Sequence, residues 1–266
     1  MAAPDMSGQF NRGKPSAFMP TIEEITPQGR IITDPFSRLA RQQSIYLFEE
    51  VNNQTSAIIV AQLFSYLNDG DKSTPIKFYI QSPGGSIYDG EAVIDAMEKL
   101  KEAGFTIETY AVGLSMSMGS QFLVAGSKGH RWALPNSTIM LHEPASTGSG
   151  HQKAEDQINS ATESAYLKTR TAMRYAAYTN MSYEQALKII TGPDYFMRAE
   201  EAVDLGVVDK IDYPIKDKEL AASLKFLNNE HYRLHKEAQS VPGLLTTAPD
   251  FKKPAVAVPV PAANLP

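Results

Sequence analysis

The sequence predicts one α/β core with a tail at each end. Short β-like runs alternate with helix-like runs over most of the 266 residues, and 42% of the residues are hydrophobic, as in ordinary globular proteins. Two junctions at which a β-like run gives way to a helix are rich in glycine and serine, at 82–86 and 113–120. A nucleophile or a free backbone N–H is useful at such a junction, so these stretches are the first candidates for a site.

The N-terminal segment changes character before the core begins. Residues 1–20 are rich in Gly, Pro, Ser and Ala and show no period, which predicts a flexible arm. The next segment is mixed, and three of its apolar side chains are expected to tether it to the core: Ile31, Ile32 and Phe36. Residues 44–48 (SIYLF) predict the first buried strand.

Two helices with a strand between them are expected next. The first helix is capped by Asn53 or Thr55, ends at 68–70 (NDG) and has apolar residues at i, i+3, i+4 and i+7. This face comprises Val60, Leu63, Phe64 and Leu67. Residues 75–81 (PIKFYIQ) predict the strand. The second helix spans about 87–103, and its apolar face comprises Val93, Met97 and Leu100.

The junction between this strand and the second helix reads Ser82-Pro83-Gly84-Gly85-Ser86. Adjacent glycines at a helix start expose a backbone N–H to a ligand, as in phosphate cradles and oxyanion holes. A plain tight turn is the structural alternative. The stretch has neither the Gly-x-Gly-x-x-Gly of a dinucleotide site nor the Gly-Lys-Ser/Thr of a phosphate-binding loop, which disfavours nucleotide binding.

Ser117 is the best candidate nucleophile. It lies between a β-like run, 106–112 (TIETYAV), and a helix-like run, 121–125 (QFLVA). The first N–H groups of a helix lack intrahelical partners and the helix dipole adds positive charge, so an oxyanion beside this serine is stabilised. Gly119 lets backbone and substrate come close. The alternative is a small-residue turn that packs a helix on a sheet.

His142 is the best candidate among the five histidines. Two β-like runs follow the serine turn, at 130–134 and 137–142, and Glu143-Pro144 stops the second one, so the imidazole is expected at a strand end. The alternative is a strand-terminal histidine hydrogen-bonded to backbone. The other four are expected to be solvated: His130, His151, His231 and His235.

The C-terminal half opens with an expected flexible loop at 145–150 and a long helix-like run at 152–179. Apolar residues are sparse in this run, so the helix is expected to project and meet another subunit rather than fold back on the core. A capping box at 182–185 predicts a short helix. A Gly-Pro break then precedes Asp194, a position that by itself is typical of a cap or turn residue.

The core is expected to end near Pro214. A short helix at 199–207 and a β-like run at 207–211 complete it. Residues 217–238 predict an added helix. The Pro, Ala and Val bias of 239–266 predicts a disordered tail.

Composition excludes several classes of function. There are 25 Lys and Arg against 30 Asp and Glu, a net charge of −5, and no basic block, which disfavours nucleic acid as a partner. The absence of Cys excludes disulfides, thiolate metal sites and a cysteine nucleophile. No apolar run approaches the ~18 residues that span a bilayer, and no secretory pattern opens the chain, so the cytoplasm is the expected compartment.

The ordered motifs resemble those of the ClpP family, the proteolytic subunits of Clp protease, from about Met19 to Asp212. The matching stretches are FMPTIEE, DPFSRL, IVAQLFSYL, FYIQSPGGSI, SMG followed by AGSKGHRWALPNS, IMLHEP and DYFMRAEEAVDLGVVD. Several motifs in one order are far more specific than a single serine motif.

This resemblance implies a role for each candidate residue. Ser117 matches the nucleophile, His142 the general base and Asp194 the residue that orients the histidine. The backbone N–H groups of Gly85 and Met118 match the oxyanion hole. The residue types suit this chemistry independently, because a serine hydroxyl is a weak nucleophile until a neutral imidazole accepts its proton.

The resemblance also implies an architecture and partners. The fold is a spiral of β-β-α units shared with crotonases, and the run at 152–179 is a handle through which two seven-membered rings stack and enclose the active sites. The partner is a hexameric unfoldase of the ClpX or ClpA type, which uses the ATP, so no cofactor and no metal are expected in this chain. The domains are then an arm (1–20), a peptidase domain (21–213) and an extension (214–266).

Surface docking of the unfoldase is assigned to Phe78 and Tyr79, since Tyr79 matches an aromatic residue of the family's docking pocket. Lys77 stands where another aromatic residue is common. Gly192-Pro193 replaces an Asp-Arg pair that links the two rings in the family. Three further positions also depart from the family pattern: Met116, Glu143 and Arg198.

Three functions remain open at this point. The first is an active serine endopeptidase that cleaves unfolded chains. The second is a non-catalytic or weakly active ring subunit, and the third is an acyl-CoA enzyme of the crotonase group, which shares the paired oxyanion donors but needs no Ser-His-Asp set. The intact set favours the first.

Overall fold

The computed structural model describes residues 20–27, 29–145, 153–213, 216 and 218–240. The expected arm at 1–20, the loop at 145–150 and the tail at 239–266 lie largely outside these described residues.

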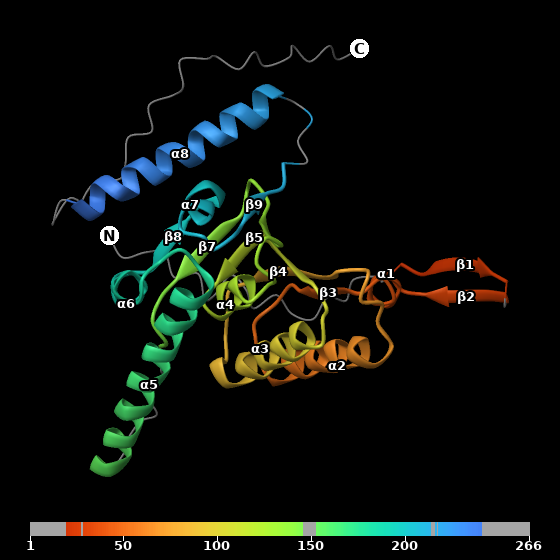
Figure 1. The fold of residues 1–266 in the computed structure, drawn as a ribbon, viewed down its shortest axis with the longest axis horizontal. Helices are drawn as coiled ribbons and strands as arrows, with labels where there is room; N and C mark the ends of the chain where they lie inside the picture. The colour runs from red at the N-terminus through yellow and green to blue at the C-terminus, as the bar shows by residue number, and fades with distance from the viewer. Residues whose placement is uncertain (1–19, 28, 146–152, 214–215, 217, 241–266) are drawn as a thin grey trace.

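A seven-stranded sheet forms the centre of the fold (Figure 1). Its main path has the order β3-β4-β5-β6-β9, with parallel neighbours throughout. The bounds are β3 Ser44–Leu47, β4 Ile76–Ser82, β5 Ile107–Met116, β6 Arg131–Ala133 and β9 Lys210–Ile211. The second half of β5 pairs with β7 (Thr138–Leu141), and β7 pairs antiparallel with β8 (Tyr195–Met197). The predicted α/β class is confirmed.

Helices α2 (Asn53–Asp69) and α3 (Ile87–Glu102) pack on each other beside the sheet. The expected buried face of α3 is confirmed, but two details of α2 are wrong. Its N-cap is Asn52, whose side chain accepts from the backbone N–H of Thr55 while the Thr55 hydroxyl accepts from the Asn52 N–H. Phe64 is 44% exposed, and the buried residues at i, i+4 and i+7 are Ile59, Leu63 and Tyr66.

The N-terminal hairpin stands away from the sheet. Strands β1 (Ile22–Thr26) and β2 (Gly29–Thr33) pair only with each other among the described residues and extend from the body in Figure 1. Ile32 is 66% exposed, and Ile31 and Phe36 are also exposed. The predicted tether is therefore wrong for Ile31 and Ile32, which lie on the exposed hairpin. Phe36 of α1 (Pro35–Ala40) does contact the central sheet, because its ring lies edge-on to the Tyr46 ring of β3 with centroids 6.2 Å apart.

Helix α5 (Ala154–Tyr178) has two halves with different surroundings. Its N-terminal half projects from the body, as predicted, and its described side chains are exposed (Figure 1). The C-terminal half packs into the subunit's own core through Leu167, Ala172 and Tyr175. The expectation that the whole helix leaves the core is wrong for this half, because a few well-placed apolar side chains suffice to bury it against its neighbours.

Three helices complete the C-terminal part. Helix α6 (Tyr183–Thr191) begins with the predicted capping box of Ser182 and Gln185. Helix α7 (Ala199–Asp204) follows β8. The added helix is confirmed as α8 (Lys218–Ser240), and it lies across α7 (Figure 1).

Two kinds of feature are missing from the described residues. None of their helices is long and apolar enough to cross a membrane. None of their His, Asp and Glu side chains form a group of three or more that could hold a metal ion.

Candidate active site

Ser117 lies at a sharp turn between β5 and α4 (Met118–Val124). Its backbone has φ 53° and ψ −120°, a conformation that is costly for a residue with a Cβ and recurs at functional sites. Its N–H donates to the Met140 carbonyl over 3.0 Å, and its carbonyl accepts from Ser120 Oγ over 2.6 Å. The surrounding backbone therefore holds the turn, and the Ser117 hydroxyl is left for other contacts.

A buried tyrosine braces this turn from α5. Tyr175 is 1% exposed, and its hydroxyl lies 2.8 Å from Ser120 Oγ. Burial raises the pKa of Tyr175 to about 12, so the hydroxyl stays protonated and can donate. No local pattern in the sequence indicates this contact between Ser120 and Tyr175, because the two residues are 55 positions apart in the chain.

The structure brings together the three predicted side chains. His142 Nε2 lies 2.8 Å from Ser117 Oγ, and His142 Nδ1 lies 3.3 Å from Asp194 Oδ1. The pairing of β7 with β8 explains the second contact. Leu141 is opposite Tyr195 in this antiparallel ladder, so the next residue of one strand and the preceding residue of the other, His142 and Asp194, face each other.

The carboxylate is the most hydrated member of the three. The Asp194 side chain is 53% exposed and the His142 side chain 25% exposed. Water therefore screens the attraction between this carboxylate and a protonated imidazole, which is weaker than it would be in a dry interior. Asp194 can still orient the imidazole ring through Nδ1, and this geometric role depends less on the local dielectric constant than the charge attraction does.

Gly84 joins the two glycine- and serine-rich junctions. A Cβ at this position would lie 2.5 Å from Ser117 Cβ and 3.0 Å from the backbone nitrogen of Met118. Gly84 also has φ 98°, which L side chains rarely adopt. The loop is pinned by two hydrogen bonds, from Val51 N–H to the Gly84 carbonyl and from Ser86 N–H to the Val51 carbonyl.

Two backbone N–H groups, those of Gly85 and Met118, belong to residues that follow Gly84 and Ser117 directly in the chain. Met118 is the first residue of α4, so its N–H has no intrahelical acceptor, and within the described part of the chain neither this N–H nor that of Gly85 has a recorded partner. Both are on peptide units next to the Gly84–Ser117 contact. The adjacent glycines at 84 and 85 indicated this junction in the sequence. The close approach to Ser117 is made by Gly84 and not by Gly85.

One of the two predicted docking residues is misplaced. Phe78 is 0% exposed and packs on Phe122 in the core, so it cannot line a surface pocket. Successive side chains of a strand point to opposite faces of the sheet, so Phe78 and Tyr79 could not line the same surface pocket. Tyr79 faces outward.

Tyr79 belongs to a continuous row of aromatic side chains across four neighbouring strands, which we call the aromatic row: Tyr46, Tyr79, Tyr110 and Trp132. The tyrosine rings stack with centroids 4.8 Å apart, and Tyr110 lies 6.1 Å from Trp132. These residues are directly opposite one another in the strand register. Of these residues only Tyr79 was predicted from the sequence, because the row depends on the strand order.

The residues that depart from the family pattern make contacts of their own. Glu143 pairs with Lys168 of α5 over 3.3 Å. The Arg198 guanidinium bonds the Thr138 hydroxyl at the start of β7. The first contact is made by the neighbour of His142, and the second lies at the other end of the β7–β8 ladder from His142 and Asp194.

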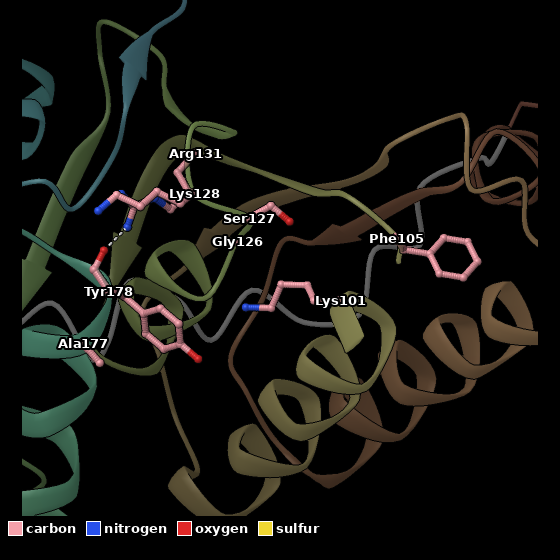
Figure 2. Close-up of a pocket in the computed structure, with 8 residues that line it drawn as sticks. All are labelled: Lys101, Phe105, Gly126, Ser127, Lys128, Arg131, Ala177 and Tyr178. Carbon is pink, nitrogen blue, oxygen red and sulfur yellow. Dashed lines mark hydrogen bonds between the residues drawn. The ribbon is translucent and has the colours of Figure 1, made fainter. Parts of the chain in front are cut away.

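A cleft of about 340 Å³ lies apart from the serine, between α3, the turn before β6 and the end of α5 (Figure 2). Arg131 on its wall is 2% exposed and pairs with Asp209 over 2.7 Å, and its guanidinium also donates to the Tyr178 carbonyl. Burial pushes the pKa of Asp209 upward, but the hydrogen bonds and charge of Arg131 outweigh it and hold the pKa below its usual range. These bonds tie β6 to α5 and to the chain before β9.

A family model described as Clp protease matches residues 27–213. The matched range is well over half of the chain and includes every residue of the candidate site. Helix α8 lies beyond it.

Proposed function

Because the chain belongs to the Clp protease family, we propose that it is a serine endopeptidase that cleaves unfolded polypeptides into short peptides. The proposal depends above all on the 2.8 Å contact between His142 Nε2 and Ser117 Oγ. A neutral imidazole at this distance can accept the hydroxyl proton.

The proposed reaction is acyl transfer through the serine. Ser117 Oγ attacks the carbonyl carbon of the scissile peptide while its proton passes to His142 Nε2, and Asp194 stabilises the imidazolium. The oxyanion accepts hydrogen bonds from the Gly85 and Met118 N–H groups, and a donor of this kind contributes about 3 kcal/mol. His142 then protonates the leaving amine, and afterwards activates the water that hydrolyses the acyl-enzyme.

A weakly active or non-catalytic ring subunit is the second candidate, and the 53% exposure of the Asp194 side chain favours it. A serine-directed fluorophosphonate tests both. The proposal predicts one label per chain on Ser117 together with cleavage of a short fluorogenic peptide. A chain that takes no label would instead be a structural subunit or an acyl-CoA enzyme of the crotonase type.

The proposal includes assembly into two stacked rings with a cytoplasmic unfoldase as partner. The projecting half of α5 supplies an apolar surface suited to contacts between rings, with Ile158 66% exposed and Ala161 and Ala165 near it on the helix. Ala172, on the C-terminal half of the same helix, is buried within the subunit and therefore does not contribute to this surface.

Ring stacking is expected to change little between low and moderate salt. Gly192-Pro193 cannot form the Asp-Arg pair by which family members link their rings, and such exposed pairs are screened over about 10 Å at 0.1 M salt. Apolar burial by the α5 stripe is not weakened by moderate salt. Sedimentation velocity across a salt series checks this. A steep conversion to single rings as salt rises would mean that other charge pairs hold the rings together.

We propose that the unfoldase docks at the aromatic row. Aromatic side chains dominate the energetics of protein interfaces, and this row is partly exposed along the sheet. Lys77 lies on the same outward face of β4 as Tyr79, two residues away, and is paired in register with Ser44 and Glu108. It therefore adds a charge at the edge of the row.

Replacing Lys77 by tyrosine should tighten docking of a ClpX-type unfoldase by about 2- to 10-fold, since an added aromatic contact contributes about 0.5–1.5 kcal/mol. The dissociation constant measured by biolayer interferometry checks this. Lys99→Tyr is the control, because Lys99 is an exposed residue of α3, outside the row. An unchanged constant for Lys77→Tyr would count against docking at this face.

A further inference from the structure

Helix α8 is fastened to the elements that carry Asp194, although it lies outside the residues matched by the family model. Asn228 is 8% exposed, and its amide donates to the Pro135 carbonyl over 3.1 Å, in the turn between β6 and β7. The Tyr232 hydroxyl bonds the Asp204 carboxylate at the end of α7. In Figure 1 the helix lies across α7 above β8. Helix α8 contributes no described residue to the hydrophobic core, so it packs on the outside of the core as an added helix.

The central contact of α8 is made to a buried carboxylate. Glu201 of α7 is 0% exposed, and its described hydrogen-bond partners are the Tyr195 hydroxyl at 2.7 Å and His235 Nδ1 at 3.2 Å. A buried carboxylate is costly unless it is paired and hydrogen-bonded. The prediction that His235 is solvated is therefore wrong, because α8 brings this histidine to a carboxylate that needs a donor.

His235 and Glu201 also contact Tyr195, which follows Asp194 in the chain. The Tyr195 ring lies 4.2 Å from the His235 ring, centroid to centroid, and its hydroxyl is bonded to Glu201. Tyr195 is also opposite Leu141 in the β7–β8 ladder. Any shift of Tyr195 would be passed to Asp194 on one side and would alter the ladder that places His142 on the other.

We propose that Tyr195 is a positioning residue for Asp194 and that α8 is the clamp that holds it, through His235 and Glu201. This inference rests on the proposed peptidase function. It assigns a role to α8 that is separate from ring assembly and docking: the helix sets the contact between Asp194 and His142. Asp194 itself is half-exposed and follows Pro193, so its own side chain has little packing to hold it, whereas Tyr195 is 9% exposed.

Two substitutions of one residue test the clamp in the full chain. His235→Phe keeps a ring against Tyr195 and removes the donor to Glu201, and His235→Gln keeps a donor. We expect His235→Phe to lower kcat for a fluorogenic peptide by about 10- to 100-fold with little change in KM, since small misplacements of catalytic groups have effects of this size. His235→Gln should remain within about threefold of the parent, because the hydrogen bond to Glu201 is retained.

Active-site labelling separates positioning from loss of folded protein. Displacement of Asp194 should lower kcat while Ser117 of every folded chain still takes one fluorophosphonate label at completion. Partial unfolding would instead lower kcat and the number of labelled sites in proportion.

A second variant and a surface control complete the experiment. Tyr195→Phe keeps the ring but loses the bond to Glu201, and it should lower kcat as His235→Phe does, with the number of labelled sites unchanged. Arg233→Ala should leave both kcat and labelling unchanged, because Arg233 pairs only with Glu230 and Glu237 of its own helix among the described residues. An active parent with an unchanged His235→Phe variant would overturn the clamp alone. A parent that neither cleaves nor takes a fluorophosphonate label would overturn the proposed function.

Discussion

Ser117→Ala should reduce peptide cleavage to the background of the uncatalysed reaction and abolish fluorophosphonate labelling. The change removes the hydroxyl that lies 2.8 Å from His142 Nε2 and leaves no nucleophile for acyl transfer. In other serine proteases the loss of a catalytic group lowers kcat by roughly 10⁶-fold. The turn should persist, because it is held by the backbone bond from Ser117 N–H to Met140 and by Ser120, not by the Ser117 side chain.

The measurement combines a fluorogenic peptide, active-site labelling and sedimentation velocity on one preparation. Ser65→Ala is the matched control, since the hydroxyl of this exposed serine of α2 donates, within the described part of the chain, only to the Gln62 carbonyl of its own helix. The ring assembly should be the same in both variants. Cleavage by Ser117→Ala at the parent rate would remove Ser117 from the mechanism and, with it, the proposed function.

Gly84→Ala should lower kcat/KM by at least about 100-fold through geometry alone. The added methyl would lie 2.5 Å from Ser117 Cβ and 2.8 Å from the Met116 carbonyl, distances at which the backbone must move. Because the Gly85 and Met118 donors are on the neighbouring peptide units, this movement should separate the nucleophile from the proposed oxyanion hole. Substrate contacts away from the reacting carbonyl are untouched, so the loss should fall mainly on kcat.

Gly104→Ala is the control for the backbone strain that any residue with a Cβ suffers at such a position. Gly104 has φ 92°, close to the 98° of Gly84, but a Cβ there would meet no non-neighbouring atom of the described residues within 4 Å. We expect it to lose about 1 kcal/mol of stability and to keep full activity. Thermal unfolding and kcat/KM for both variants make the comparison. Equal loss of activity in the two, or full activity in Gly84→Ala, would show that the contact between the two junctions is not needed.

Local sequence determined the elements and the residue types of the site. The alternation of β-like and helix-like runs led to the α/β class, and the capping box at Ser182 and the apolar face of α3 were recognisable because each depends on residues within a few positions of one another. The ordered motifs pointed to the family and to three side chains. The structure brings those side chains within 2.8 Å and 3.3 Å contacts, and their catalytic roles stay predictions.

Tertiary structure alone decided which distant segments meet. The aromatic row requires the strand order β3-β4-β5-β6, the approach of Gly84 to Ser117 requires two junctions to pack together, and the bond from His235 to Glu201 requires α8 to fold back. The same holds for the buried half of α5 and for the exposed Ile32 on its hairpin. Local periodicity reports which face of an element is apolar, but the partner of that face is set by the packing free energy of the whole chain, in which residues far apart in sequence compete for the same core.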